Sequence, residues 1–265
     1  MKEITVEEKK KLSLEILCEI HDFCEKNDIC YYLDYGTLLG AVRHKGYIPW
    51  DDDIDISMKR NDYEKFLTTF HSLKYEIANY RDKKFFAIQF SKVFDKNTYG
   101  ILLEKINLNY GIAVDIFPLD DIPEEEIERK RLLNKLKKIE KIYLKSMFCK
   151  NFIKITGFKD LIKFIYGKIF PSNRMARKLE DLVLKKHSEN TSLLGYILSP
   201  VCLGINKKSS YDSRVLLQFE DKQFYAPNDY DSVLITHYGK NYMQPPAEEN
   251  RETTHTEKYY WKEDL

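Results

Sequence analysis

Four carboxylates fall within five positions of this 265-residue chain, at Asp51, Asp52, Asp53 and Asp55. Ile54 and Ile56 alternate with the last two of them, which is the period-two pattern of a strand with one buried face. Asp53 and Asp55 should therefore share the opposite face of an extended segment. Neighbouring carboxylates repel each other unless they are protonated or bridged by cations, and oxygen ligands at this density suit Mg²⁺ or Mn²⁺ better than zinc.

A Gly-Thr pair, Gly36 and Thr37, precedes a short helix-prone stretch that lies upstream of the acids. Backbone amides in a glycine turn can approach a phosphate closely, and a helix N-terminus favours an anion. Negative phosphates also need cations, which Arg43 and Lys45 beside the turn and Lys92 on an expected interior strand can supply. The pattern therefore indicates metal-assisted chemistry on a phosphate.

The unbroken stretch of residues 32–56 closely resembles the signature of the LicD family. This family comprises bacterial phosphocholine transferases and eukaryotic relatives of the fukutin group that transfer ribitol phosphate. The order of glycine turn, helix and Asp-x-Asp strand is also that of the nucleotidyltransferase superfold. Residues 92–98 and 111–120 resemble further segments of the family, and residues 238–246 resemble it more loosely.

The resemblance implies a catalytic and metal-binding set made of Asp53, Asp55 and Asp115, which would hold Mg²⁺ (or Mn²⁺) for in-line phosphoryl transfer. Asp115 lies between apolar residues, so it needs a partner, and an ion pair with an arginine is the structural alternative to a metal or base role. A choline donor would also seek aromatic faces. The expected substrate-binding residues are Gly36, Thr37, Arg43, Lys45, Trp50 and Lys92.

The resemblance implies a transferase that moves phosphocholine from CDP-choline to a sugar hydroxyl of a cell-surface polysaccharide or a teichoic acid precursor. Within the same class, the donor could instead be CDP-glycerol or CDP-ribitol, or the reaction could be true nucleotidyl transfer. A non-catalytic binder of nucleotides or of an anionic polymer is the alternative from another class. Such a binder need not keep three mutually repelling acids.

Apolar periodicity predicts an α/β (α+β) fold with a nucleotidyltransferase-like mixed sheet, flanking helices and a basic helical insertion. We expect a catalytic core over residues 1–122, the insertion over 123–190, and a C-terminal segment over 191–265 that packs back on the core. Strands are expected over residues 30–33, 53–57, 75–78, 85–94 and 111–117, and the tail 242–246 should be extended. Helix caps are expected at Thr5 with Glu8, Asn61 with Glu64, and Asn228, with helix breaks near Gly157 and at Pro171.

Residues 129–178 contain 16 Lys or Arg and two acids, Glu140 and Asp160, although the whole chain has a net charge of +1. We expect this segment to contact an anionic membrane surface peripherally and expect no nucleic acid partner, although the lysines could simply solubilise helices. Lys154, Lys159, Lys163 and Lys168 do not share one helical face, so the charge pattern alone does not predict an interfacial helix.

We expect a cytoplasmic protein that can lie peripherally at the inner face of the membrane. No segment offers the roughly 20 apolar residues that a spanning helix needs, and residues 1–10 lack an apolar leader. The five cysteines are scattered and odd in number, so we expect reduced and mostly buried thiols.

Overall fold

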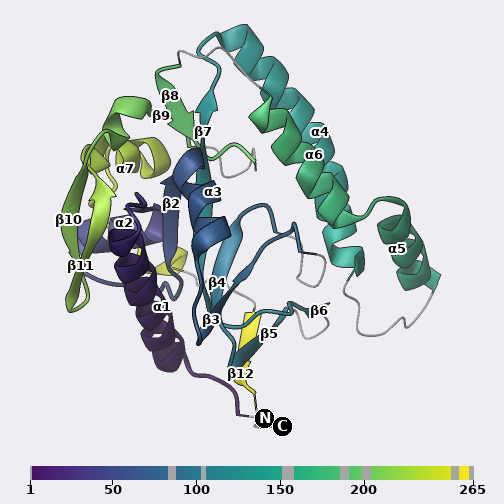
Figure 1. Cartoon of the computed structure of the whole chain (residues 1–265), viewed down its shortest axis with the longest axis horizontal. Helices are drawn as coiled ribbons and strands as arrows, with labels where there is room; N and C mark the ends of the chain where they lie inside the picture. The colour runs from purple at the N-terminus through teal and green to yellow at the C-terminus, as the bar shows by residue number, and fades with distance from the viewer. Residues whose placement is uncertain are drawn as a thin grey trace.

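The computed structural model of the chain describes residues 2–82, 88–102, 106–150, 158–185, 191–198, 204–251 and 257–262. Its largest sheet is mixed and has five strands in the order β1–β2–β7–β4–β3, with β8 and β9 added beside the far end of β7 (Figure 1). This architecture confirms the predicted α/β fold. The five strands are β1 (Tyr32–Leu33), β2 (Asp55–Lys59), β7 (Ala113–Ile122), β4 (Ser91–Asp95) and β3 (Tyr75–Ala78).

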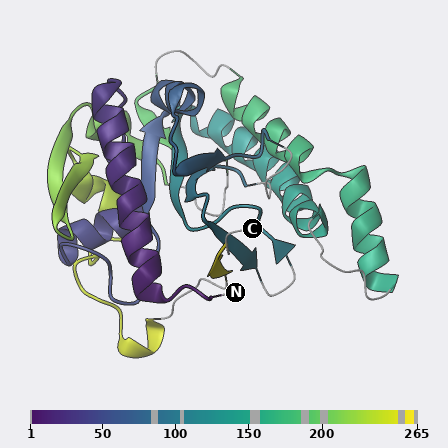
Figure 2. The same cartoon turned by 60° about the horizontal axis from the view of Figure 1, so that its bottom comes forward.

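The central strands β2 and β7 are parallel, and β4 runs antiparallel to β7. Their apolar side chains alternate with polar ones and form one face of the sheet, where Ile54, Ile56, Val93, Val114 and Ile116 are fully buried. Helices α1 (Val6–Lys26) and α3 (Arg60–Thr69) cover this face (Figure 2). The apolar alternation therefore fixes which face of the sheet carries the acids.

The capping box predicted at the start of α1 is confirmed. The hydroxyl of Thr5 accepts a hydrogen bond from the backbone N–H of Glu8, whose carboxylate accepts one from the N–H of Thr5. The predicted cap of α3 by Asn61 with Glu64 is wrong. This helix begins earlier than predicted, at Arg60, with Lys59 at the N-cap position and no side-chain cap. Glu64 is therefore inside the helix, where its carboxylate binds Arg60 and Arg81.

A cluster that we name the Arg60 network joins three parts of the fold. The guanidinium of Arg60 donates two hydrogen bonds to the carboxylate of Asp120 on β7, at 2.7 and 2.6 Å. Arg60 also binds Glu64 and, on helix α6 (Ser172–Leu184), Glu180, and Arg81 binds the same two glutamates. The network therefore ties the basic helical segment to the sheet.

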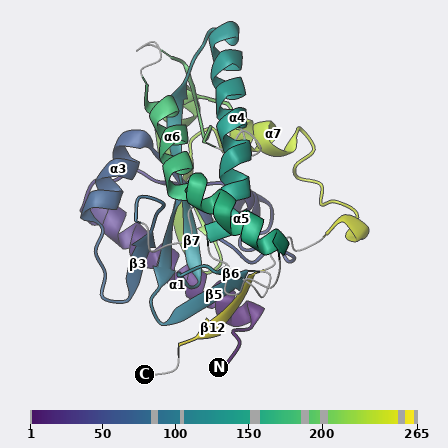
Figure 3. The ribbon, with the colours of Figure 1, turned by 90° about the vertical axis from the view of Figure 1, so that its right-hand side faces the viewer.

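The basic segment forms three helices, α4 (Glu126–Lys150), α5 (Phe158–Ile169) and α6, of which α4 and α6 pack side by side (Figure 3). The predicted break at Pro171 is confirmed, because this residue immediately precedes α6. The break predicted near Gly157 lies outside the described residues. Helix α5 contacts α4 and lies at one end of the molecule (Figure 1).

Residues beyond 190 return to the core. The short strands β8 (Leu193–Gly195) and β9 (Asn206–Lys207) extend the sheet beside β7, and the 3₁₀ turn η1 (Lys208–Tyr211) follows. A hairpin of β10 (Arg214–Phe219) and β11 (Lys222–Pro227), absent from our predictions, leads to α7 (Tyr230–Tyr238). The cap of α7 is Asp229 and not the predicted Asn228, because the Asp229 carboxylate accepts from the N–H of Ser232.

The predicted end of α7 at Gly239 is confirmed, whereas the prediction of an extended tail after it is partly wrong. Gly239 ends the helix with a φ of 80°, a backbone conformation that glycine adopts without strain. The tail predicted as extended over residues 242–246 is wrong at its start, since Tyr242 and Gln244 donate backbone hydrogen bonds that close turns. A second 3₁₀ turn, η2 (Glu248–Asn250), follows.

The two ends of the chain meet in a small second sheet. Strand β12 (Glu257–Trp261) pairs with β5 (Thr98–Leu102), which pairs on its other side with β6 (Ile106–Asn107). The N–H of Ile4 donates to the carbonyl of Tyr259 at 2.9 Å, so the start of the chain lies beside its end (Figure 1).

Several strand boundaries differ from the predictions. Strand β1 begins at Tyr32 instead of residue 30, and β2 covers Asp55–Lys59 instead of 53–57. Strand β4 covers Ser91–Asp95, so it begins later than the predicted 85–94, whose residues 85–87 lie outside the described part, and β7 begins at Ala113 instead of 111. Strand β7 continues through Pro118, which we expected to follow its end. The proline is tolerated because β4 pairs with β7 no further than Ile116, so the strand edge beside Pro118 needs no N–H donor.

The described cysteines agree with the prediction of reduced thiols. Cys24 is buried, Cys18 and Cys30 are half-buried, and all three are free. Cys202 and the side chain of Cys149 lie outside the described residues.

Candidate active site

Three charged side chains form a row across the middle of the large sheet. Asp55 on β2 is the direct register partner of Asp115 on β7, and Asp115 is the partner of Lys92 on β4. Register partners point to the same face of a sheet, opposite the buried isoleucines. The ammonium of Lys92 forms an ion pair with the Asp115 carboxylate. The cation that neutralises Asp115 is thus a lysine and not the arginine that we weighed.

The acids of this row resist ionisation together. Burial raises the pKa of Asp55 well above its usual range, and the nearby charges of Asp53 and Asp115 raise it further. Burial also raises the pKa of Asp115, although Lys92 opposes the shift. Burial alone would lower the pKa of Lys92, but Asp115 raises it overall. The site therefore concentrates negative charge that a bound cation would stabilise.

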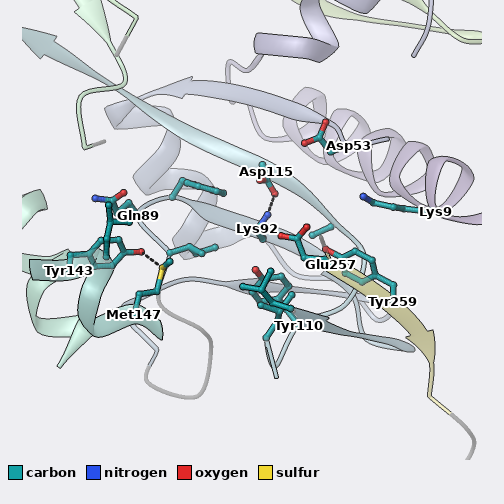
Figure 4. Close-up of a pocket in the computed structure, with 16 residues that line it drawn as sticks. Lys9, Asp53, Gln89, Lys92, Tyr110, Asp115, Tyr143, Met147, Glu257 and Tyr259 are labelled. Atoms are coloured by element: carbon teal, nitrogen blue, oxygen red, sulfur yellow. Dashed lines mark hydrogen bonds and ion pairs between the residues drawn. The ribbon is translucent and has the colours of Figure 1, made fainter. Parts of the chain in front are cut away.

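A cavity of about 300 Å³, which we name the Asp115 cavity, opens in front of this row (Figure 4). Its charged lining comes from distant parts of the chain, namely Lys9, Asp53, Lys92, Asp115 and Glu257. Its aromatic lining comes from Phe90, Tyr110, Tyr143 and Tyr259. The ammonium of Lys92 lies 5.1 Å from the ring centre of Phe90 and 5.6 Å from that of Tyr110, so these faces already attract a cation.

A second cavity of about 430 Å³, the Trp50 cavity, lies between α2 (Tyr35–Arg43) and the turns that follow α7. Arg43 donates a hydrogen bond to the carbonyl of Tyr242 at 2.7 Å and so joins these two elements. The Arg251 guanidinium lies 4.9 Å from the ring centre of Trp50. The residues that line the Trp50 cavity include Gly36, Arg43, Trp50, Asp51, Tyr238 and Tyr242.

Residues of the glycine turn position the acids. A Cβ atom at Gly36 would lie 2.5 Å from a carboxylate oxygen of Asp51, so a larger residue there would displace the Asp51 side chain. The buried hydroxyl of Thr37 accepts a hydrogen bond from the backbone N–H of Asp55 at 2.8 Å. Asp34 caps α2 and lies 3.8 Å from the imidazole of His237. Gly36 and Thr37 do not form the predicted turn ahead of a helix, because they lie in the first turn of α2 itself, and this helical turn holds the start of β2 beside it.

The predicted site residues thus divide among several places. Asp53, Asp115 and Lys92 line the Asp115 cavity, whereas Gly36, Arg43 and Trp50 line the Trp50 cavity. The hydroxyl of Thr37 accepts a hydrogen bond from the backbone N–H of Asp55. Lys45 lies apart from these groups, since its side chain is exposed and reaches the carbonyl of Val42 at 3.3 Å.

Of the residues that line the Asp115 cavity, only Asp53, Lys92 and Asp115 were predicted; Lys9, Glu257 and Tyr259 are among those that were not. Lys9 forms an ion pair with Asp52 at 2.9 Å, and both side chains are nearly buried. Glu257 and Tyr259 belong to β12, and they line the cavity because β12 pairs with β5. The aromatic run at residues 259–261 is a local signal for that strand, but no local signal points to its partner.

The donor set suits a hard cation in its chemistry, because carboxylate oxygens are the ligands that Mg²⁺ and Mn²⁺ prefer. Among the described residues, however, no three His, Cys, Asp or Glu side chains are gathered closely enough to hold a metal ion. One of the three carboxylates predicted to bind the metal, that of Asp115, forms an ion pair with Lys92. The metal therefore stays a prediction.

Comparison with known proteins bears directly on this site. Residues 28–157 match the family model described as "LicD/FKTN/FKRP, nucleotidyltransferase domain". The chain is 31% identical to the lipopolysaccharide cholinephosphotransferase LicD of Haemophilus influenzae, over 98% of this chain and 99% of that protein. The chain belongs to the LicD family.

Two shorter matches are local. An uncharacterized protein of Rickettsia typhi is 43% identical over 83 residues, and one of Rickettsia prowazekii is 40% identical over 82 residues. These matches cover 30% and 29% of this LicD-family chain, and 27% and 31% of the relatives. The matched family segment contains the acids and Lys92, whereas Lys9, Glu257 and the turns after α7 lie outside it.

Replacing Thr37 with valine is expected to lower the free energy of unfolding by about 1–3 kcal/mol, because the N–H of Asp55 loses its acceptor. Transfer activity should fall as well, since Asp55 would no longer be fixed. Urea unfolding and a transfer assay would measure the two effects. Thr37→Ser keeps the hydroxyl and is the matched control. Equal losses in both variants would contradict the role of this hydrogen bond.

Proposed function

We propose that this LicD-family protein transfers phosphocholine from CDP-choline to a sugar hydroxyl of a surface glycan of the lipopolysaccharide type. The similarity to the Haemophilus influenzae cholinephosphotransferase carries this proposal, because it spans both chains almost completely. The acidic row supports it, since a binder of nucleotides has no need for mutually repelling carboxylates.

The reaction joins the acceptor oxygen to the phosphorus that bears choline. The bond from this phosphorus to the bridging oxygen of the diphosphate breaks, and CMP leaves with that oxygen. The hydroxyl proton passes to a carboxylate, for which we propose Asp115 because it lies in the cavity with a raised pKa. Lys92 would then stabilise negative charge on the transferred phosphate.

We propose Asp53, Asp55 and Asp115 as the residues that would hold Mg²⁺ or Mn²⁺, for which their side chains would have to come closer together than they lie in the structure. A divalent ion would offset the repulsion among these acids and the charge of the diphosphate. Lys92 forms an ion pair with Asp115, which reduces the cost of burying this carboxylate.

The two cavities suit different parts of the donor. Trp50 and Tyr242 offer aromatic faces on which a pyrimidine can stack, and Arg43 offers a cation for phosphate. In the Asp115 cavity, Phe90 and Tyr110 already attract the ammonium of Lys92, which suits the trimethylammonium of choline. We therefore place the nucleoside in the Trp50 cavity and the choline in the Asp115 cavity.

Calorimetric titration of CDP-choline, CDP-glycerol and CDP-ribitol with Mg²⁺ tests the donor. We expect CDP-choline to bind about tenfold more tightly than the other two, since aromatic contacts to a cation contribute about 0.5–2 kcal/mol. The double variant Asp53→Asn, Asp55→Asn should lose the metal-dependent part of this binding. Preference for another CDP-alcohol would replace the substrate and keep the mechanism.

Product analysis separates the remaining alternatives. Phosphocholine on the acceptor with release of CMP supports the proposal, whereas a transferred nucleotide with release of pyrophosphate would mean true nucleotidyl transfer. Absence of binding to all three donors, with no effect of metal, would overturn the enzymatic assignment and favour a binder of anionic polymers.

A further inference from the structure

Helix α5 exposes a continuous stripe of large apolar side chains, formed by Phe158, Leu161, Ile162, Ile165 and Ile169. Their spacing of three or four residues puts them on one face of the helix. We name this face the α5 stripe. Between 42% and 77% of each side chain is exposed to solvent. A stripe that other amphipathic helices bury therefore faces outward here, as expected of an interaction site.

The other side of α5 attaches the helix to the protein. Tyr166 is half-buried, and the ammonium of Lys145 on α4 lies 5.9 Å from its ring centre. The ring of Tyr166 also contacts that of Phe170, with 5.0 Å between their centres. Figure 3 shows α5 crossing the outer side of α4, away from the large sheet. The stripe is thus not the side by which α5 contacts α4.

Lysines flank the α5 stripe on both sides. By helical position, Lys159 lies beyond one edge of the stripe and Lys168 beyond the other, whereas Lys163 lies closer to the opposite side of the helix, and all three are exposed. The ammonium of Lys168 lies 5.3 Å from the ring centre of Phe164, so its aliphatic stem runs along apolar surface. The lysines do not share one face, as the sequence indicated, but the apolar residues between them do.

We propose that the α5 stripe docks this protein on an anionic lipid bilayer. Apolar side chains would enter the boundary between headgroups and acyl chains, while the flanking lysines contact anionic headgroups. The sixteen basic residues of 129–178 add to the same attraction. A second copy of the chain fits less well, because pairing two stripes would bring the lysines of both copies together.

The geometry requires a helix that lies in the plane of the membrane. Helix α5 has 12 residues and is about 18 Å long, which is shorter than the hydrocarbon core of a bilayer. No helix in the described part of the chain combines the length and the apolar character needed for a span. The proposal stands on α5 alone, so its test and the donor test above can fail separately.

Flotation of the full chain with lipid vesicles tests the proposal. We expect binding to vesicles of phosphatidylcholine mixed with phosphatidylglycerol and weak binding to phosphatidylcholine alone. The variant Ile162→Glu, Ile165→Glu should bind the mixed vesicles at least about tenfold more weakly. Leu73→Glu is the matched control, because Leu73 is a fully exposed apolar residue outside the basic segment, and it should bind like the unchanged chain.

A second variant keeps the test decisive if the first one unfolds. Lys159→Glu, Lys163→Glu, Lys168→Glu leaves the α5 stripe intact and should lose the preference for anionic vesicles. Absence of binding to the mixed vesicles would overturn the proposal, as would equal binding by the stripe variant and the Leu73→Glu control. Dimers on gel filtration that dissociate in the stripe variant would assign the stripe to a second copy instead.

Discussion

Asp55→Asn is expected to lower the rate of phosphocholine transfer by about 10³-fold, the magnitude that follows from removing one charged group that stabilises a transition state. Asp55 lies at one end of the acidic row, with Asp115 as its register partner and the charge of Asp53 nearby. The amide keeps the shape of the side chain but removes its charge. The loss should therefore appear in kcat, with little change in the thermal unfolding midpoint.

The matched control for this variant is Asp221→Asn, which removes an exposed carboxylate at the turn between β10 and β11. It should keep full activity. Asp115→Asn is less clean, because it also leaves the buried ammonium of Lys92 without its partner and should reduce stability as well. Transfer by Asp55→Asn at a rate within about tenfold of the unchanged enzyme would contradict the assignment of Asp55.

The second large effect concerns stability. Asp120→Ala is expected to lower the free energy of unfolding by about 3–5 kcal/mol, because it leaves the guanidinium of Arg60 buried without its bidentate partner. Glu64 and Glu180 would remain beside Arg60, but neither offers two parallel hydrogen bonds to it. Urea denaturation followed by circular dichroism would measure the change.

An exposed ion pair provides the comparison. Glu126 and Lys130 lie one turn apart at the start of α4 with both side chains mostly exposed, so Glu126→Ala should cost about 0.5 kcal/mol or less. The double variant Arg60→Met, Asp120→Leu should recover much of the stability, since it removes both buried charges together. A loss below about 1 kcal/mol in Asp120→Ala would show that water or other partners satisfy Arg60.

The acidic site was predictable where the signal was local. Alternation of acids with isoleucines identifies the strand at Asp55 and its buried face from a few neighbouring residues. The apolar run around Asp115 identifies a second buried strand in the same way. The pairing of Lys92 with Asp115 was not predicted, because it depends on the order and direction of the strands rather than on either strand alone.

The hairpin of β10 and β11 escaped prediction because its turn lacks the usual residues. Glu220 adopts a φ of 56° there, a conformation that glycine or asparagine usually provides. Contacts with the loop that follows α2 hold Glu220 in this conformation. The Glu220 carboxylate accepts a hydrogen bond from the N–H of Tyr47, and the N–H of Glu220 donates one to the carbonyl of Lys45. Tertiary hydrogen bonds thus stabilise this turn in place of the usual turn-forming residues. Sequence rules for turns consider only neighbouring residues, so they do not predict it.

The helix caps show the same contrast. Thr5 and Glu8 bond to each other's backbone, so their capping box depends on four consecutive residues and was correctly predicted. The cap predicted at Asn61 with Glu64 failed because α3 begins at Arg60, which leaves Glu64 at the fifth position of the helix. Its carboxylate instead accepts a hydrogen bond from Arg81, which is 17 residues away, at 2.7 Å. Contacts with the rest of the fold, which the local sequence does not show, thus surround the start of this helix.

The pairing of β12 with β5 has a consequence for how each copy of the protein is made. A ribosome adding about 5–20 residues per second releases residue 257 roughly 8–32 s after residue 98. During that interval one edge of β5 has no partner, and the Asp115 cavity lacks Glu257 and Tyr259. An unpaired edge invites association with other chains. We therefore expect the nascent chain to expose an unpaired β5 edge and an incomplete Asp115 cavity until β12 has emerged.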